Sequence, residues 1–232
     1  GSYTMAAGDT INDLIKKAGG YTENAYQFGA VYLNKDAKTV NELSKEILYQ
    51  EFLDNIIALS QQNIGGSTDL TPIVKLTEEI KNTEPNGRVV IDLLNDSTID
   101  LYGVKEGDEL FVPETNNVVY VYGEISSEGA VMFSENKGVE YFVDKSGGFK
   151  KFADRESIYI LHPNGESQLY RSKRNIFENR PKSEMQIYPG SIIFVPRALD
   201  DSAPRRLATQ AYVSILGNLG IALASLSAIN DD

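Results

Sequence analysis

Few residues in this sequence have the type and spacing for chemistry. His162 is the single histidine, and it stands directly before Pro163-Asn164-Gly165, a run typical of a hairpin turn. The turn predicts a surface histidine, and no serine–histidine–aspartate set or histidine-based metal site can be assembled around it. The chain also has no cysteine, which excludes thiolate nucleophiles, disulfides and cysteine metal sites.

The acidic residues are plentiful but do not point to a catalytic pair. A glycosidase needs only two carboxylates, and the sequence has 33 acidic residues. Asp92, Asp96 and Asp100 recur at helix-like or turn-like spacing in a polar segment, which favours a solvated surface. Gly19-Gly20 is not followed by the Lys-Ser/Thr of a phosphate-binding loop. We therefore expect no enzyme, no metal and no cofactor.

Composition narrows the partners. The net charge of −11 argues against nucleic acid and against a broad polybasic membrane surface, because both need clustered Lys and Arg. The apolar fraction of 41% is ordinary for a folded, core-forming protein. Tyrosines are numerous and their rings can stack on sugars, but Tyr120 and Tyr122 alternate along a predicted strand. That alternation favours core or cross-strand pairs.

Two sequence blocks occur twice in the same order. The pair Gly19-Gly20 recurs as Gly147-Gly148, an offset of 128 residues, with similar residues before each pair. The Gly107-Asp108 block recurs at Gly190-Ser191, an offset of 83. The difference between the offsets, 128 − 83 = 45, predicts an insertion in the first copy, most simply between Asn34 and Pro85.

Each block predicts a defined element. Thr10 is expected to cap a helix over 11–18, which the glycine pair at 19–20 ends. Four strands are predicted, at 30–33, 118–125, 157–161 and 192–195. The insertion is predicted to be a helical hairpin over about 36–83, because its apolar residues recur near a 3.6-residue period and Thr71-Pro72 restarts a helix. This hairpin either covers its own module or forms a partner interface.

These motifs resemble the SLBB domain, a β-grasp module named for soluble-ligand binding. The residues that carry the resemblance are Gly-Asp-Thr-Ile-x-x-Leu-Ile-x-x-Ala-Gly-Gly at 8–20, its echo at 138–148, the two Gly-(Asp/Ser)-x-(Leu/Ile)-x-Val-Pro endings, and Val121-Tyr122-Gly123-Glu124-Ile125 followed by Gly129-Ala130-Val131. The resemblance covers roughly residues 3–197. It implies an α+β fold with two tandem β-grasp (SLBB) modules, at 3–115 with the insertion at about 36–83, and at 116–197.

Tandem SLBB modules ahead of a C-terminal helix are similar to the Wza/KpsD class of bacterial capsule and exopolysaccharide export proteins. In that class the modules stack into a periplasmic ring, and C-terminal segments cross the outer membrane. The resemblance implies a non-catalytic ring homo-oligomer in the periplasm and outer membrane of a Gram-negative bacterium. Its implied partners are the translocating polysaccharide and an inner-membrane polysaccharide co-polymerase or exporter. We expect the chain to be a C-terminal fragment of a longer protein.

The last predicted element is an uncharged helix over 207–229, after a linker at 198–206. At ~1.5 Å per residue its length of ~35 Å exceeds a hydrocarbon core of about 30 Å. The residues predicted to face lipid are Tyr212, Ile215, Leu216, Leu219, Leu223 and Leu226. The residues predicted to line a wet lumen are Gln210, Ser214, Asn218 and Ser225.

Two function classes remain open at this point. The first is a ring-forming component of a polysaccharide export channel that uses the terminal helix to cross the outer membrane. The second is a periplasmic or surface β-grasp module that binds a soluble ligand or sugar, with the terminal helix packed on the domain. Oligomeric state in a mild detergent separates the two, because the exporter needs a ring and the binder can be a monomer.

Overall fold

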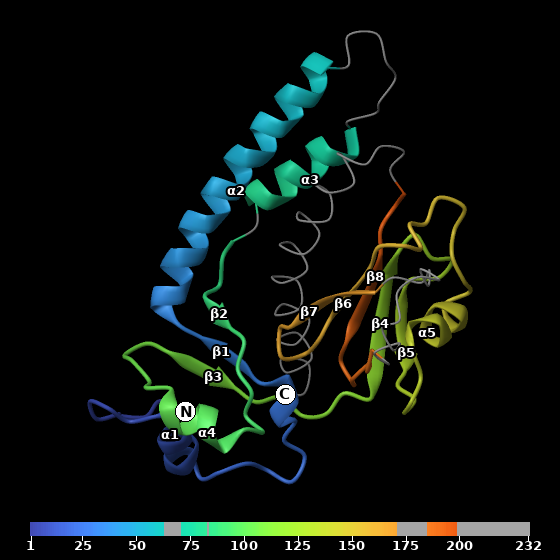
Figure 1. Ribbon diagram of the computed structural model, residues 1–232. Coiled ribbons are helices and arrows are strands. Elements are labelled where there is room, and N and C mark those ends of the chain that lie inside the picture. The colour runs from blue at the N-terminus through green and yellow to red at the C-terminus, as the bar shows by residue number, and fades with distance from the viewer. Residues whose placement is uncertain (63–70, 83, 171–184, 199–232) are drawn as a thin grey trace, which may run out of the picture.

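The protein combines two sheets with five α-helices in the part of the chain that the computed structural model describes. The described residues are 1–62, 71–82, 84–170 and 185–198. The first sheet has three strands in the order β2-β1-β3, and the second has five in the order β5-β4-β8-β6-β7. In Figure 1 the first sheet lies near α1 and α4, and the second lies beside α5. The predicted α+β class is confirmed.

We refer to the three-stranded sheet with its flanking residues, 1–34 and 84–115, as the first unit. Its elements are α1 (Ile11–Ala18), the 3-10 turn η1 (Gln27–Gly29), β1 (Val31–Leu33), β2 (Arg88–Val89), α4 (Asp96–Leu101) and β3 (Glu109–Phe111). Helix α1 has the predicted bounds. Its N-terminus is closed by a capping box, in which the Thr10 hydroxyl accepts from the Asp13 N–H and the Asp13 carboxylate accepts from the Thr10 N–H. Ile11 and Ile15 are the buried face of this helix.

The second unit is the five-stranded sheet with its flanking residues, 116–170 and 185–198. Its elements are β4 (Val118–Gly123), β5 (Gly129–Met132), α5 (Val139–Lys145), β6 (Ile158–Leu161), β7 (Ser167–Tyr170) and β8 (Ile192–Val195). Strand β4 runs parallel to β8, and the other pairs are antiparallel. Phe142 and Val143 of α5 are fully buried against Val121 and Ile193 of the sheet. This apolar contact forms the core of the second unit.

The two offsets found in the sequence also relate the strand pairs of the two sheets. Tyr32 of β1 pairs with Leu110 of β3, and adding 128 and 83 gives Ile160 and Ile193, which pair between β6 and β8. The isolated bridges obey the same rule, Ala25↔Glu114 becoming Ala153↔Arg197. A shared register of this kind indicates that the two sheets have the same local architecture around these strands.

The helix ends repeat as well. Gly20 donates its N–H to the Ile15 carbonyl at 2.9 Å, and Gly148 donates to the Val143 carbonyl at 2.9 Å. Both glycines have positive φ, +86° and +82°, the region in which L-residues other than glycine are strained. The glycine pair therefore ends α1 as predicted and has the same role after α5, and this is why Gly-Gly is the clearest repeated feature of the sequence.

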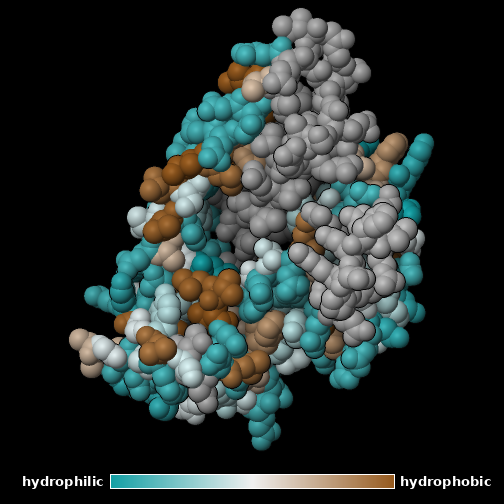
Figure 2. Space-filling view, viewed as in Figure 1, coloured by the Kyte–Doolittle hydropathy of each residue, from teal (hydrophilic) through white to brown (hydrophobic). Residues whose placement is uncertain are grey.

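The insertion occupies the connection between β1 and β2, where the second unit has only a short turn between β6 and β7. It contains α2 (Lys35–Gln62) and α3 (Thr71–Asn82), which pack against each other and on which Phe52 and Ile80 are buried. Val40, Leu43 and Ile47 of α2 are instead 53–64% exposed, and Figure 2 shows apolar patches along this helix. Both predicted helices are present, but the start of α2 leaves its apolar side chains uncovered.

The predicted linker and terminal helix fall on residues that are almost wholly outside the described part, which ends at residue 198. The proposed lumen and lipid faces, all within 210–226, are therefore not described. Within the described ranges, no helix combines the length and the apolar character needed to cross a bilayer. The module boundaries at 115/116 and 197 stay predictions.

Candidate functional site

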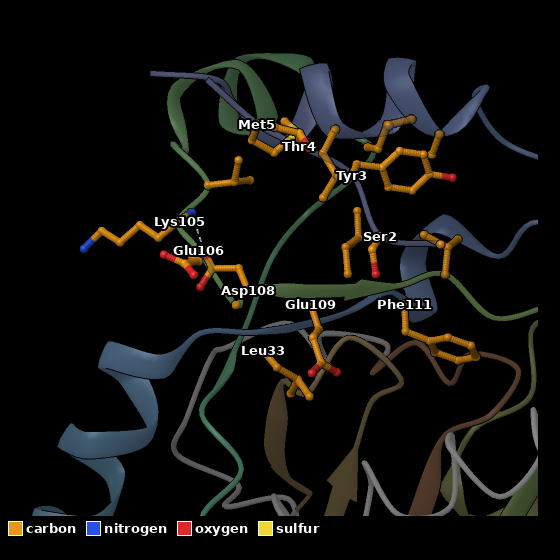
Figure 3. Close-up of a pocket in the computed structure, with 18 of the residues that line it drawn as sticks. Ser2, Tyr3, Thr4, Met5, Leu33, Lys105, Glu106, Asp108, Glu109 and Phe111 are labelled. Atoms are coloured by element: carbon orange, nitrogen blue, oxygen red, sulfur yellow. Dashed lines mark hydrogen bonds between the residues drawn. The ribbon is translucent and has the colours of Figure 1, made fainter. Parts of the chain in front are cut away.

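A groove of about 1200 Å³ lies in the first unit, between the N-terminal segment 1–7 and the stretch 104–112 that contains β3. Figure 3 shows Ser2 to Met5 on one side of it, with Glu109 and Phe111 of β3 on the other. Leu14 and Ile15 of α1 also line it. Its volume is above the roughly 300–1,000 Å³ of small-molecule pockets, so its size favours a larger occupant.

Asp108, the acid directly before β3, is held in place by hydrogen bonds. Asp108 accepts from the Asn34 amide at 2.8 Å, from the Lys105 N–H at 2.7 Å, and from the Tyr32 hydroxyl. Burial and the neighbouring Asp108 carboxylate together raise the pKa of Tyr32 above its usual value. Asp108 therefore fastens the turn before β3 to β1, and its oxygens are occupied by that role.

The opposite wall of the groove is fastened to α1. Asp9 accepts from the Ala6 N–H at 2.7 Å and pairs with Lys17 at 2.7 Å, and Lys17 also donates to the Thr4 carbonyl at 3.1 Å. The hydrogen bond from Lys17 lowers the pKa of Asp9 below its ordinary value. This exposed pair contributes little to stability. Its consequence is positional, because it fixes residues 4–9 at a distance from β3.

The two units meet in an aromatic joint, formed by Tyr26 and Phe28 of the first unit with His162 and Tyr188 of the second. Across the two units, the Phe28 and Tyr188 ring centroids are 4.1 Å apart, and Phe28 meets the His162 ring edge-on at 6.4 Å. The Tyr26 hydroxyl donates to the Pro189 carbonyl at 3.1 Å, and burial raises the pKa of this tyrosine. Aromatic edge-to-face contacts of this kind add to the apolar burial, so the joint holds the units together.

His162 does not lie on the surface, and that prediction is wrong. Its side chain is only 2% exposed, because the turn after β6 packs against the first unit and not toward solvent. Its Nδ1 lies 3.2 Å from the Ser191 hydroxyl, and burial lowers the pKa of the imidazole. Its counterpart at the 128-residue offset is Asn34, which bonds Asp108. The equivalence of these two contacts is a signal that the sequence contained.

Arg88 adds a further contact between the two units beside the aromatic joint, and no sequence motif marks it. Its guanidinium donates to the Pro163 carbonyl across the two units, and burial lowers the pKa of Arg88 to about 10. Its Nε and second terminal nitrogen have no protein partner in the described part of the chain. A buried cation adjacent to the turn after β6 makes the joint a polar as well as an aromatic contact.

The groove and the aromatic joint both have side chains suited to binding and packing. Across the ranges that are described, no cluster of three or more acidic or histidine side chains is arranged to hold a metal ion. The groove offers an apolar floor and the exposed rings of Tyr3 and Phe111, at 42% and 38% exposure. The joint offers buried contacts between units. The Ser191 hydroxyl does lie beside the His162 imidazole, but both side chains are buried, at 0% and 2% exposure, so this contact is closed to a substrate.

Comparison with protein families gives one match. The model of the SLBB domain matches residues 1–36 and 118–170, one stretch in each repeat. This match bears out the resemblance to the SLBB domain that the motifs indicated.

Comparison with individual proteins gives a more particular likeness. The chain is similar to the polysialic acid transport protein KpsD of Escherichia coli, of which two sequences match with 25% identity over 117 residues. The matched stretch is 50% of this chain and spans only 20% of the length of each relative.

Proposed function

We propose that this chain is a non-catalytic component of a channel that exports a bacterial polysaccharide, such as a capsule or an exopolysaccharide. The observation that carries the proposal is the likeness to a polysialic acid transport protein, on a chain whose two units each match the SLBB domain. The proposed location is the periplasm and outer membrane of a Gram-negative bacterium. Its partners would be the moving polysaccharide and an inner-membrane co-polymerase or exporter.

The proposed architecture is two tandem β-grasp modules that assemble side by side with further copies into a ring. The common register of the two sheets supports repeated modules. The aromatic joint supports a fixed orientation between them, because Phe28 contacts His162 and Tyr188, and Tyr26 donates to the Pro189 carbonyl, across the two units. A rigid two-module block is the kind of subunit that a closed ring requires.

The described acidic groups suit a structural role. Asp9 and Asp13 close the start of α1, and Asp108 fastens the turn before β3. The hydrogen bonds from Thr10 hold the pKa of Asp13 below its ordinary value, which keeps this cap charged. The net charge of −11 would also oppose tight binding of an acidic polymer, so such a polymer could slide past without being held.

The terminal segment 207–229 is proposed to form one stave of a helical barrel through the outer membrane. Gln210, Ser214, Asn218 and Ser225 would line a wet lumen. Leu216, Leu219 and Leu223 would face lipid with Tyr212, Ile215 and Leu226. The reason is that unsatisfied amides are not tolerated against hydrocarbon, whereas copies around a water-filled lumen would solvate Gln210 and Asn218. A weakly polar lumen lets a hydrated polymer pass.

Single cysteines test this stave, because the chain has no cysteine of its own. A membrane-impermeant thiol reagent applied to cells should modify Asn218→Cys and Ser214→Cys. The same reagent should spare the matched controls Leu219→Cys and Leu223→Cys, which are predicted to lie on the opposite, lipid-facing side of the same helix. Equal labelling of both sets, or of neither, would count against a lumen and favour the soluble binding module.

A further inference from the structure

The second unit carries a group of exposed cations around two aromatic rings, which we call the basic patch. The patch consists of Lys150, Lys151, Arg155, Arg197, Phe149 and Phe152. Its four cations are exposed, and the Phe152 ring is 50% exposed. The chain as a whole has a net charge of −11. A local gathering of positive charge is therefore an exception on this molecule, and it points to an anionic ligand.

Backbone pairing holds the two parts of the basic patch together. Most of the patch lies in the segment 149–155, between α5 and β6, whereas Arg197 follows β8. Ala153 and Arg197 form an antiparallel bridge. Ala198 donates its N–H to the Phe152 carbonyl at 2.7 Å. The cations are thus presented from a backbone that is fixed against the end of the sheet.

Three of the cations lie over the rings of the patch. The Arg197 Cζ is 4.8 Å from the Phe152 ring centroid, and the Arg155 Cζ is 4.8 Å from that of Phe149. The Lys151 Nζ is 5.2 Å from the Phe152 centroid. A ring face attracts a cation through its charge, so the guanidinium N–H donors stay available. The contacts also restrain long side chains, which lowers the entropy lost when a ligand binds.

The positive charge of the patch is not neutralised within the described residues. Neither the Arg155 nor the Arg197 guanidinium has an ion-pair or hydrogen-bond partner in that part of the chain. Asp154, the acid of the same segment, is only 5% exposed, and its carboxylate accepts from the Glu156 N–H at 3.0 Å. Arg197 and Lys151 share one ring, and like charges this close repel each other. A bound anion would relieve this repulsion.

The first unit shows that the architecture does not require these cations. The bridges at Ala25 and Ala153 are equivalent, because 153 − 128 = 25. At the offsets of 128 and 83, the counterparts of Lys151, Arg155 and Arg197 are Glu23, Gln27 and Glu114. The same backbone therefore carries two acids and an amide in the first unit. The cations of the second unit call for a reason other than folding.

A sugar polymer with carboxylate groups has the chemistry that the patch recognises. Guanidinium groups bind carboxylates through paired N–H···O bonds. The exposed face of the Phe152 ring carries partial negative charge, on which the C–H groups of a sugar ring can pack. A lipid headgroup would use the cations alone, because a half-covered ring cannot insert into hydrocarbon. The acidic remainder of the chain repels such a polymer, so the contact stays local and weak.

We propose that the basic patch is a binding site for a carboxylated sugar polymer. Arg155 and Arg197 pair with its carboxylates, and Phe152 packs on a sugar ring. The choice of a glycan over other polyanions rests on the proposed export function. Each copy of the second unit would then give the moving polymer one weak contact.

Calorimetric titration of the full chain with an oligogalacturonate at low ionic strength tests the site. The probe should bind, and its affinity should fall as salt is added. A neutral malto-oligosaccharide of the same length should not bind measurably. Arg155→Gln combined with Arg197→Gln should weaken oligogalacturonate binding by about tenfold or more. Thermal unfolding of this variant should be unchanged, because both side chains are exposed.

Two further variants separate charge from position and ring from charge. Lys16→Gln combined with Lys38→Gln removes the same charge from exposed positions outside the second unit, and it should bind as the unmodified chain does. Phe152→Asn introduces the residue that the first unit has at this place, Asn24. It should weaken binding by about threefold or more, because the ring contact is lost.

Four outcomes would overturn the proposal. The first is absence of oligogalacturonate binding, and the second is equal affinity in the double arginine variant. The third is equal binding of the neutral oligosaccharide. The fourth is binding of phosphatidylglycerol vesicles without binding of oligogalacturonate, which would make the patch a membrane contact. Unchanged affinity in Phe152→Asn would refute the packing of a sugar ring on that residue.

Failure of the site and failure of the export function give different results. A chain that forms a closed assembly in mild detergent but does not bind oligogalacturonate refutes the site and leaves the export function standing. A chain that binds the probe at the basic patch but stays monomeric contradicts the export ring and leaves the site standing.

Discussion

The two units share strand register and helix ends but carry different side chains at equivalent positions. Tyr32↔Leu110 and Ile160↔Ile193 occupy the same register, and both helices end at a left-handed glycine pair. The polar contact beneath the turn is an amide–carboxylate pair in one unit, Asn34 with Asp108, and an imidazole–hydroxyl pair in the other. The comparison teaches that register and helix ends define this architecture, whereas the polar contact can change.

The units also differ in completeness. The second unit has a strand on each side of β8, and its core includes fully buried Phe142. The first unit has the groove at the equivalent position, and Leu14 faces it only partly covered. Side chains at equivalent positions should therefore contribute unequally to stability, and equivalent backbone features should contribute equally.

The largest expected effect separates the two cores. Phe142→Ala should lower the free energy of unfolding by about 3–5 kcal/mol, because it removes a fully buried ring and leaves a cavity. The matched variant Leu14→Ala should cost less than half as much, since its side chain is already in contact with solvent. The two losses in unfolding free energy are measured by urea unfolding, with hydrogen exchange used to monitor each unit separately. Equal losses would contradict the difference in burial.

The next effect tests what the units share. Gly20→Ala and Gly148→Ala should each cost about 1–2 kcal/mol, because both residues have positive φ. An added Cβ meets nothing within 4 Å at either position, so strain in φ is the whole cause. The control Gly103→Ala should be nearly silent, because Gly103 does not have a positive φ and an added Cβ would meet only the Asp9 carbonyl, at 3.8 Å. Thermal unfolding measures both variants. If one of them were as stable as the unmodified protein, the two helix ends would not be equivalent.

A smaller effect sharpens the comparison at the helix starts. Thr10→Ala should cost about 1 kcal/mol, because it removes one half of the capping box of α1. Helix α5 begins at Gly138 with no side-chain cap, so Gly138→Ser should gain a few tenths of a kcal/mol. The two changes are compared by chemical denaturation. A silent Thr10→Ala would mean that the capping box does not stabilise α1.

The smallest effect depends on pH. Burial holds the pKa of His162 below 6.5 in the folded protein, so the unfolded state binds more protons between the two pKa values. The contribution of neutral His162 is present above pH 6.5 and is lost as the pH falls toward the folded-state pKa. His162→Asn, which introduces the residue of the other unit, should flatten this dependence in denaturation curves between about pH 5 and 7. Parallel curves for the two proteins would contradict the role of burial.

Local signals account for what the sequence predicted. The bounds of α1, the glycine ends of both helices and the strands at 31–33, 158–161 and 192–195 follow from caps, turn residues and apolar runs. The helical insertion was predictable because two repeat offsets disagreed by a fixed amount. Each of these features depends on residues close together in the chain, or on the repetition of such residues.

Contacts between the units account for what the sequence did not predict. His162 is buried because Phe28 and Tyr188 pack against it, and Arg88 contacts Pro163 from 75 residues away. No local pattern marks either pairing. The groove was missed for a similar reason, because it is defined by a strand that one unit has and the other lacks. Long-range packing, not local propensity, determines these sites.

The claim that this chain forms a ring for export is tested most directly by its mass in a mild detergent. Native mass spectrometry of the full chain should give a closed multi-subunit assembly. A chain without residues 204–232 should be a monomer with both units folded, as judged by hydrogen exchange in β6 and β1. A full chain that is monomeric in detergent would contradict the claim, and so would a deletion that unfolds both units cooperatively, because residues 204–232 would then belong to a soluble core.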